Sequence, residues 1–418
     1  MESAKYLIIG AGPAALAAAQ AIRIQDKDGS ITLVTKENTL PYSPAVLPYL
    51  LSEELTEQDL FGKGKELLEK LRVNLMRGKE AAAIRHESYE VEFTGGERQP
   101  YDKLLIATGA APQIPDIVNL EPGRIHTFRT YDDFTGLKET LGSEQSIAIY
   151  GAGLVAVEAA EKLCMAGHQV TIIARSSLLR KYFSPASVEL LTQAFRQHGG
   201  RLLTNHTLVS VRKTQDKMEL TLSKGEKLLV DHLLIATGVL ANLIDHNQLV
   251  VENGGVKVDQ YMKTCLGDVY AAGDVAAAPS FYDGRHAPCP ILPEAVLQGK
   301  VAGANMVGKA VEYPGWISGN YLRCFTENLF SIGLVGPQPG EAYKILERHD
   351  GGRSLRLVFK DDYLVGAEAL NMKSIHPGVL LNLIRRQIPV REYQELLLAK
   401  PRETACWLML KQGKTQAV

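Results

Sequence analysis

Short apolar runs, glycine turns and small-residue stretches alternate along the first part of this chain. Residues 6–9 (Y-L-I-I) and 31–35 (I-T-L-V-T) are short, mainly apolar or β-branched, and bounded by polar or glycine residues. They therefore predict buried strands. The residues that follow Gly12 are rich in alanine and predict a helix between these two strands.

The turn between the first strand and this helix has the spacing G-x-G-x-x-A, with Gly10, Gly12 and Ala15 at the defining positions. The first glycine permits a tight turn, the second lets the backbone approach a pyrophosphate, and the small third residue lets the helix pack on the strand. The helix N-terminus then offers free N–H groups to phosphates. The alternative interpretation is a tight turn that binds no ligand.

This pattern occurs twice in the chain. Residues 6–22 read Y-L-I-I-G-A-G-P-A-A-L-A-A-A-Q-A-I, and residues 147–163 read I-A-I-Y-G-A-G-L-V-A-V-E-A-A-E-K-L. A second pair follows in the same order, D-K-L-L-I-A-T-G from Asp102 and D-H-L-L-I-A-T-G from Asp231. Two motifs that recur in one order predict two copies of a nucleotide-binding unit.

Other stretches predict what surrounds these units. Residues 41–51 contain three prolines, which predict a rigid loop without regular helix before Ser52. Residues 55–71 have helical spacing that Gly62 and Gly64 are expected to interrupt. The second copy is expected to continue with a helix over 154–166 and a strand over 169–174. After residue 314, two predicted strands (323–334 and 355–370) precede two predicted helices (379–386 and 390–398), which indicates an α+β tail.

Composition excludes several classes of function. The length of 418 residues predicts two or three domains, and a net charge of -1 gives no broad attraction to nucleic acid or to an anionic membrane. No apolar run approaches the roughly 18 residues of a membrane span, and the first residues lack the pattern of a signal peptide. We therefore expect a cytoplasmic protein. The cysteines (Cys164, Cys265, Cys289, Cys324 and Cys406) are scattered, so no metal site is predicted.

Four motifs together resemble those of the pyridine nucleotide–disulfide oxidoreductase superfamily. They are G-A-G-P-A-A at 10–15, A-T-G at 107–109, G-A-G-L-V-A at 151–156 and A-A-G-D at 271–274. The resemblance covers residues 5–310 strongly and the tail loosely. It implies an α/β fold with two Rossmann-like domains and a C-terminal α+β domain. The implied limits are 1–112 with 240–315 for FAD, 113–239 for NAD(P), and 316–418 for the C-terminal interface domain.

The resemblance implies that the first copy binds FAD. The glycine turn would face the pyrophosphate, Glu37 the adenosine ribose, and Asp274 the ribityl chain. Backbone atoms of Ala81 would hold adenine, and the helix near Glu294 would point its N-terminus at the flavin and stabilise the anionic reduced form. A surface glutamate with no ligand is the alternative for Glu37. The full set of implied FAD residues is Gly10, Gly12, Pro13, Ala14, Ala15, Glu37, Ala81, Thr108, Gly109, Gly273, Asp274, Glu294 and Ala295.

The second copy would bind the nicotinamide nucleotide through Gly151, Gly153, Leu154, Val155, Arg175 and Gly238. An acidic residue at the end of the following strand would select NAD, but Ala174 stands there and Arg175 follows. Loss of the carboxylate and gain of an arginine favour the 2′-phosphate of NADP. The alternative is a solvated arginine loop and use of NAD. We write NAD(P) here, with NAD as the first choice from the narrower resemblance given below.

Two residues are candidates for catalysis. Glu158 matches a family glutamate that follows the nicotinamide glycines and often pairs with a lysine beside the flavin. The early loop here reads P-Y-S-P-A-V-L-P-Y, with Pro44 in place of the arginine that rubredoxin reductases carry and Tyr49 near the position of the lysine. We therefore expect Tyr49 or solvent to replace that lysine.

The absence of cysteine before Cys164 decides the predicted reaction. Disulfide reductases, coenzyme A disulfide reductases and NADH oxidases of the superfamily all need a cysteine in this part of the chain. What remains is hydride transfer between nicotinamide and flavin, followed by electron transfer to or from an iron–sulfur protein or other subunits of a complex. Within that branch the chain is similar to NAD-linked flavin subunits of 2-oxoacid dehydrogenase complexes, such as that of phenylglyoxylate dehydrogenase. The alternatives are an oxidase or coenzyme A–(per)sulfide reductase, and a non-catalytic FAD-binding scaffold.

Overall fold

The computed structural model describes residues 3–119, 124–244, 248–336, 340–372 and 374–415. Its internal contacts define two compact units. The first unit comprises Met1–Gln113, Phe128–Glu139 and Gly238–Ile317, and the second comprises Ile114–Thr127, Thr140–Thr237 and Ser318–Val418. The units are described separately here, and the division of the chain into three domains stays a prediction.

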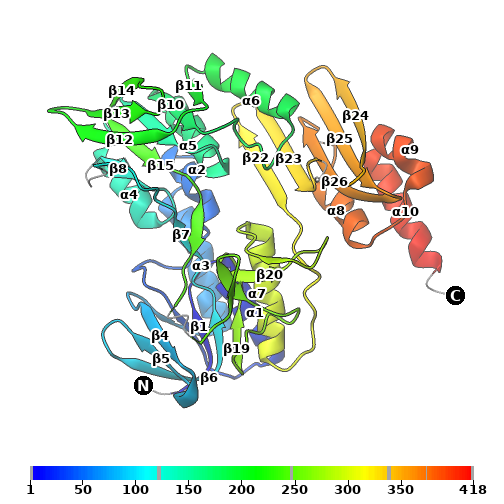
Figure 1. Cartoon of the computed structure of the whole chain (residues 1–418). Coiled ribbons are helices and arrows are strands. Elements are labelled where there is room, and N and C mark those ends of the chain that lie inside the picture. Colours follow the sequence, from blue (N-terminus) through cyan, green and yellow to red (C-terminus); the bar gives the residue numbers. More distant parts are fainter. Residues whose placement is uncertain (1–2, 120–123, 245–247, 337–339, 373, 416–418) are drawn as a thin grey trace. The chain divides into compact units, whose positions relative to one another are not determined.

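A parallel sheet forms the centre of the first unit (Figure 1). Its parallel strands are β3 (Val73–Met76), β2 (Ile31–Val34), β1 (Ala4–Ile9), β6 (Arg98–Ile106) and β19 (Val269–Ala271), in that order. The antiparallel strands β5 (Glu90–Phe93) and β4 (Ala81–Arg85) extend it beyond β6. The register aligns Ile9 with Val34 and Ile106, so the carboxyl ends of β1, β2 and β6 meet at one edge.

Two helices of small residues pack closely in this unit, α1 (Pro13–Gln25) and α7 (Leu292–Met306). A methyl group built at Gly299 would lie 2.2 Å from the carbonyl oxygen of Ala14, and one at Gly303 would lie 2.4 Å from that of Ala18. The glycines of α7 are therefore required by the close approach of the two backbones. The other helices are η1 (Pro44–Val46), α2 (Leu47–Leu51), α3 (Glu57–Leu71), η2 (His86–Ser88) and α4 (Tyr131–Thr140), the last of which ends at the limit of the unit.

Two expectations for this region were wrong. The proline-rich loop contains η1 and α2, because Pro44 and Pro48 occupy first-turn positions where no N–H donor is needed. Helix α3 is continuous through Gly62 and Gly64. A methyl group at Gly64 would lie 2.0 Å from the carbonyl oxygen of Pro41, so this glycine lets α3 pack on the loop rather than interrupting the helix.

Two small sheets complete the first unit. Strands β7 (Ala110–Pro112) and β16 (Val239–Ala241) form one, and β17 (Val251–Glu252), β18 (Gly255–Lys257), β20 (Ala276–Pro279) and β21 (His286–Ala287) form the other. Strand β19 and the turn after it bring the A-A-G-D motif back to the central sheet.

The second unit repeats the parallel arrangement of the first, as the sequence repeat predicts. Its parallel sheet has the order β11 (Arg201–Thr204), β10 (Gln169–Ala174), β9 (Ser146–Tyr150), β15 (His232–Ile235) and β8 (Ile125–His126). Helices α5 (Leu154–Met165) and α6 (Pro185–Gln197) accompany it, and β12 (Leu208–Lys213), β13 (Met218–Leu222) and β14 (Lys227–Val230) form an antiparallel meander. The predicted helix over 154–166 is confirmed, with Gly167 in the left-handed region just after it.

The tail of the second unit is an α+β structure, as predicted. Its antiparallel sheet has the order β22 (Gly319–Cys324), β23 (Glu327–Gly333), β26 (Tyr363–Leu370), β25 (Arg353–Lys360) and β24 (Lys344–Asp350). Four helical segments follow, α8 (Pro377–Arg385), η3 (Arg391–Tyr393), α9 (Gln394–Ala399) and α10 (Pro401–Thr415). No helix among the residues described above is long and apolar enough to cross a membrane.

Candidate dinucleotide-binding sites

The first glycine turn has the geometry that a pyrophosphate site requires. Gly10 has a φ of +119°, and a methyl group there would lie 2.0 Å from the carbonyl oxygen of Ala107. Gly12 is the N-cap of α1, and a methyl group on it would meet no atom within 4 Å. The turn is thus closed against the sheet at Gly10 and open at Gly12, where a phosphate can approach the free N–H groups of Ala14 and Ala15.

The A-A-G-D motif lies against this turn. A methyl group built at Gly273 would lie 3.1 Å from the Cβ atom of Ala14 and 3.8 Å from that of Ala295. The N–H of Gly273 donates to the side chain of Gln298 on α7 at 2.8 Å. The structure therefore brings together three separate predicted segments, those around Gly12, Asp274 and Ala295.

Arg129 is a residue of this region that the sequence did not reveal. Its guanidinium group donates to the carboxylate of Asp274 at 2.6 Å and to the carbonyl oxygen of Ala110 at 3.2 Å. It also lies 3.8 Å from where a methyl group on Gly109 would be. Arg129 belongs to no motif quoted above, and only the fold brings it next to Asp274.

The predicted ribose and loop residues are held by hydrogen bonds. Glu37 follows β2 and accepts a hydrogen bond from the Tyr42 hydroxyl at 2.7 Å, while that hydroxyl accepts one from the N–H of Tyr131 at 2.8 Å. The Thr108 hydroxyl donates to the carbonyl oxygen of Asn242 at 2.7 Å. These contacts fix the positions of Glu37 and Thr108. Ala81 begins β4 and is half-buried.

Glu294 differs from the other predicted flavin residues because its side chain is turned inward. The residue is buried, and its carboxylate accepts hydrogen bonds from the Tyr313 hydroxyl at 2.5 Å and from the N–H of Ile317 at 3.2 Å. The Tyr313 hydroxyl also contacts Gln298, the residue that holds Gly273. Glu294 therefore belongs to a buried network that supports the turn.

The second glycine turn repeats the geometry of the first. Gly151 has a φ of +149°, and a methyl group there would lie 2.1 Å from the carbonyl oxygen of Ala236. Gly153 is the N-cap of α5 and has open space around its α-carbon. Leu154 and Val155 form the first turn of α5, and Val155 is exposed. Gly238, with a φ of +125°, instead begins a segment of the first unit, where its carbonyl oxygen accepts from the N–H of Gln113.

Basic side chains gather beside this second turn. The N–H of Leu179 donates to the carbonyl oxygen of Ala152 at 2.8 Å, so the segment after β10 folds back on the glycine turn. Ala174 is buried at the end of β10, and Arg175, Arg180 and Lys181 are exposed. Within the described part of the chain these three cations form no ion pair or hydrogen bond. The arrangement offers free positive charge where a nucleotide would extend from the turn.

Glu158 lies one helical turn beyond the start of α5. Burial raises the pKa of its carboxyl to about 7, the Glu161 carboxylate raises it as well, and the Lys162 ammonium opposes both effects. Tyr49 lies half-buried in α2 of the first unit. Because the two residues belong to different units, the pairing of Tyr49 with Glu158 stays a prediction.

Residues 4–299 match the family described as Pyridine nucleotide-disulphide oxidoreductase. The chain belongs to this family. It is accordingly an oxidoreductase, and its cofactors are FAD and a nicotinamide nucleotide. The assignment of individual residues to each cofactor is a proposal.

Three curated relatives align over most of the chain. One is the NADH-dependent phenylglyoxylate dehydrogenase subunit epsilon of Aromatoleum evansii, 35% identical over 96% of each chain. Another is the NAD(P)H sulfur oxidoreductase (CoA-dependent) of Pyrococcus furiosus, 28% identical over 99% of this chain and 93% of the relative. A third is the ferredoxin–NAD(+) reductase component of the 3-phenylpropionate/cinnamic acid dioxygenase of Photorhabdus laumondii, 27% identical over 89% and 94%.

A solved structure shares the fold, with a TM-score of 0.86 and 24% identity over 92% of this chain and 91% of the other. It is an engineered water-forming NADPH oxidase bound to NADPH, derived from the water-forming NADH oxidase of Lactobacillus brevis. Five substitutions distinguish it from its parent: glycine to alanine, aspartate to alanine, alanine to arginine, methionine to serine, and proline to arginine.

Two cysteines of the chain lie where burial disfavours the thiolate form. Burial raises the pKa of Cys164 to about 11 and that of Cys289 to about 12, with the carboxylates of Glu294 and Asp274 adding to the effect at Cys289. Cys289 is nevertheless close enough to Asp274 to feel its charge. The sequence did not indicate that Cys289 lies near Asp274.

Proposed function

We propose that this chain is the flavin subunit of a complex related to phenylglyoxylate dehydrogenase, in which it exchanges hydride with NAD(P) and passes single electrons to or from an iron–sulfur partner. The observation that carries this proposal is the match to the epsilon subunit, which spans 96% of both chains at 35% identity. The similarity to a ferredoxin reductase component over 89% of the chain supports electron exchange with an iron–sulfur partner. The early loop (residues 41–51), without cysteine, supports electron relay over disulfide chemistry.

Each part of the first site then has a role. The open turn at Gly12 and the first turn of α1 bind the pyrophosphate, and Glu37, oriented by Tyr42, accepts hydrogen bonds from the ribose hydroxyls. Asp274 and Arg129 form the polar wall beside the glycine turn. When bound there, FAD supplies the two-electron to one-electron conversion that amino-acid side chains cannot supply.

Anaerobic stopped-flow reduction of the purified FAD-loaded chain tests this function. We expect the flavin to be bleached by a nicotinamide nucleotide and then reoxidised quickly by a one-electron dye. Oxygen or coenzyme A disulfide as sole acceptor should support only slow turnover. Fast turnover with either would instead favour the oxidase or coenzyme A–(per)sulfide reductase alternative, and flavin that no nicotinamide nucleotide bleaches would favour the scaffold.

We further propose that the second site prefers NADP(H) to NAD(H). The residues introduced in the engineered NADPH oxidase are alanine, alanine, arginine, serine and arginine. With the same spacing, this chain has Ala156, Ala174, Arg175, Ser176 and Lys181. Four of the five residue types agree, and the fifth keeps its positive charge.

The physical reason is charge at the end of β10. An acidic residue there repels a 2′-phosphate and holds the free 2′-hydroxyl of NAD, and Ala174 can do neither. The unpaired side chains of Arg175, Arg180 and Lys181 lie on the segment that Leu179 ties to the glycine turn. A guanidinium group with no protein partner is free to form charge-assisted hydrogen bonds with a phosphate.

Substitution of Arg175 tests this preference. We expect Arg175→Ala to raise the KM for NADPH about ten- to hundredfold with little change in the KM for NADH, because only the 2′-phosphate contact is lost. Lys213→Ala, which removes an exposed cation from the meander of the same unit, is the matched control. If the wild-type chain preferred NADH to NADPH, the proposal would be contradicted. The epsilon subunit is named as NADH-dependent.

A further inference from the structure

A groove of about 710 Å³ lies on the helical layer of the first unit. It is lined by Gln20, Ala21, Arg23, Ile24, Lys27, Leu67, Lys70, Leu71 and Lys300. Most of its surface is apolar, and the side chain of Ile24 is 64% exposed. Ile24 lies twelve residues beyond Gly12, which is about 18 Å along α1, so the groove is remote from the glycine turn.

Positive charge surrounds this apolar surface. In the part of the chain that the structure describes, the side-chain ammonium groups of Lys27, Lys70 and Lys300 have no ion-pair or hydrogen-bond partner. The buried guanidinium group of Arg23 donates only to backbone carbonyl oxygens, including those of Leu71 at 2.8 Å and of residue 29 at 2.9 Å. No carboxylate is among the groove-lining residues, so the lining itself carries only positive charge.

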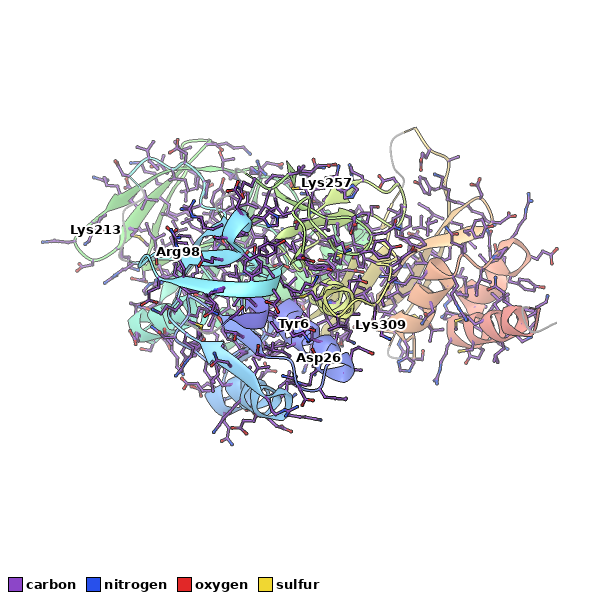
Figure 2. All side chains as sticks on the ribbon, turned by 90° about the horizontal axis from the view of Figure 1, so that it is seen from below. Tyr6, Asp26, Arg98, Lys213, Lys257 and Lys309 are labelled. Atoms are coloured by element: carbon purple, nitrogen blue, oxygen red, sulfur yellow. The ribbon has the colours of Figure 1, made fainter. Side chains whose placement is uncertain are left out.

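Exposed Glu66 and Glu69 of α3 precede Lys70 in sequence but do not line the groove. The acidic residues on either side of Lys27 are engaged elsewhere. Asp26 precedes Lys27, but its carboxylate accepts from the Lys5 ammonium at 2.8 Å and from the Tyr6 hydroxyl at 2.9 Å. Figure 2 labels Tyr6 and Asp26, which lie together beside α1. Asp28, which follows Lys27, pairs with Arg72 at 3.4 Å. The groove therefore presents an apolar floor with a cationic rim.

We propose that this groove binds an acidic amphipathic helix from another subunit of the complex. This inference rests on the proposed function, which supplies the partner. Apolar residues one helical turn apart would cover Ile24 and Leu67, and carboxylates beside them would meet Lys70 and Lys300. A second copy of this chain fits less well, because a two-fold contact would place one cationic rim against another.

The position of the groove gives this contact an anchoring role. It is formed by the C-terminal half of α1, whereas the nucleotide turn is at the N-terminal end of that helix. A bound helix would therefore leave the turn open, and loss of the contact should leave flavin reduction unchanged. The docking surface and the redox centre can thus be tested separately.

The test uses the complex that this chain forms in its own cells, purified through a tag on the chain. A zero-length carbodiimide reagent joins lysine ammonium groups to carboxylates that they contact. We expect mass spectrometry to find Lys27, Lys70 or Lys300 joined to Asp or Glu of a different polypeptide. Ile24→Glu should weaken the complex about thirtyfold or more, and Lys70→Glu with Lys300→Glu about tenfold, the latter less at high salt.

Two controls carry matched changes elsewhere. Leu229→Glu alters a side chain of the second unit that is 59% exposed, and Lys213→Glu with Lys224→Glu reverses two exposed charges of its meander. Neither control should weaken the complex. Every groove variant should keep the wild-type rate of flavin reduction by the nicotinamide nucleotide, which shows that it folds.

Three outcomes overturn the docking proposal: cross-links from these lysines to a second copy of this chain, an intact complex without such cross-links, and groove variants that dissociate no faster than the controls. A chain that purifies alone but reduces its flavin overturns the docking surface and leaves the redox assignment standing. Cross-links to an acidic subunit in a complex whose flavin is not reduced would overturn the redox assignment and leave the docking surface standing.

Discussion

The Glu158 carboxyl combines burial with a neighbouring carboxylate on one helix. Burial in α5 and the charge of Glu161 raise its pKa to about 7, so it changes charge near neutral pH. It lies five residues beyond Gly153, where the proposed nucleotide phosphates would bind. Below pH 7 the side chain is mostly neutral, and above pH 7 it is mostly an anion that repels the nucleotide.

We therefore predict that nucleotide binding weakens as the pH rises from 6 to 8. Titration at each pH should show an increase in Kd of up to about fivefold in the wild-type chain, as expected for a charge interaction of about 1 kcal/mol. Glu158→Gln should hold Kd at its low-pH value throughout. Glu189→Gln, an exposed change on α6, should keep the wild-type pH dependence. A wild-type profile that matches the Glu158→Gln profile would contradict this role.

At the scale of elements, the packing of α1 against α7 is the contact that shapes the proposed flavin site. Gly299 meets the backbone of Ala14, and Ala14 in turn lies next to Gly273. A side chain at position 299 would push α7 away from the turn whose N–H groups are proposed to bind phosphate. Packing and cofactor binding are therefore coupled through one glycine.

We predict that Gly299→Ala destabilises the chain by about 1–3 kcal/mol, the range typical of overpacked sites, and weakens FAD retention. Thermal unfolding and flavin release on gel filtration measure the two effects. Gly62→Ala is the matched control, because Gly62 lies inside α3 with no atom within 4 Å of an added methyl group. That change should stabilise the chain by about 0.5–1 kcal/mol. Equal effects of the two substitutions would contradict the packing argument.

The sequence predicted elements where local pattern and tertiary role agree. The two glycine turns, the β10 strand and the α5 helix were all predictable, because the backbone conformation and the residue type point to the same structure there. The sequence failed where packing decides the role of a residue. Gly64 belongs to a continuous helix because Pro41 approaches it, and the Glu294 carboxylate turns inward because Tyr313, nineteen residues later, donates to it. Arg129 joins Asp274 across 145 residues of sequence, beyond the reach of a motif.

At the scale of the whole second unit, buried carboxylates link the part that is proposed to bind nucleotide to the tail. Glu368 of β26 is buried and accepts from the N–H of Ser184 at 2.7 Å and from its hydroxyl at 2.7 Å, where Ser184 caps α6. Glu161 of α5 accepts from the N–H of Phe325 at 2.6 Å, in the turn between β22 and β23. Hydrogen bonds to ionised groups are the stronger kind. The tail and the nucleotide-binding sheet should therefore unfold together.

The same unit contains a buried histidine pair that makes its stability depend on pH. The Nε2 atom of His126 lies 3.1 Å from the Nδ1 atom of His232, and the Nε2 atom of His232 lies 3.1 Å from the side-chain oxygen of Gln145. Both residues are buried, and this chain of hydrogen bonds is satisfied when both rings are neutral. Burial and then the Arg124 charge lower the pKa of His232.

A pKa lowered by folding means that the unfolded chain binds the proton more readily. The contribution of His232 is therefore fully present above its ordinary pKa of about 6.5 and is lost as the pH falls below that value toward the folded pKa. We predict that the second unit loses stability as the pH falls from 7 to 5.

Tryptophan fluorescence can follow the second unit alone. The chain has two tryptophans, Trp316 in the first unit and Trp407 in the second, so the fluorescence of Trp316→Phe reports unfolding of the second unit. In that background His232→Gln should lower stability at pH 7 and reduce its dependence on pH, whereas His349→Gln, at a side chain 60% exposed, should retain that dependence. If the second unit of the Trp316→Phe chain were equally stable at pH 5 and pH 7, the buried histidine pair would not control its stability.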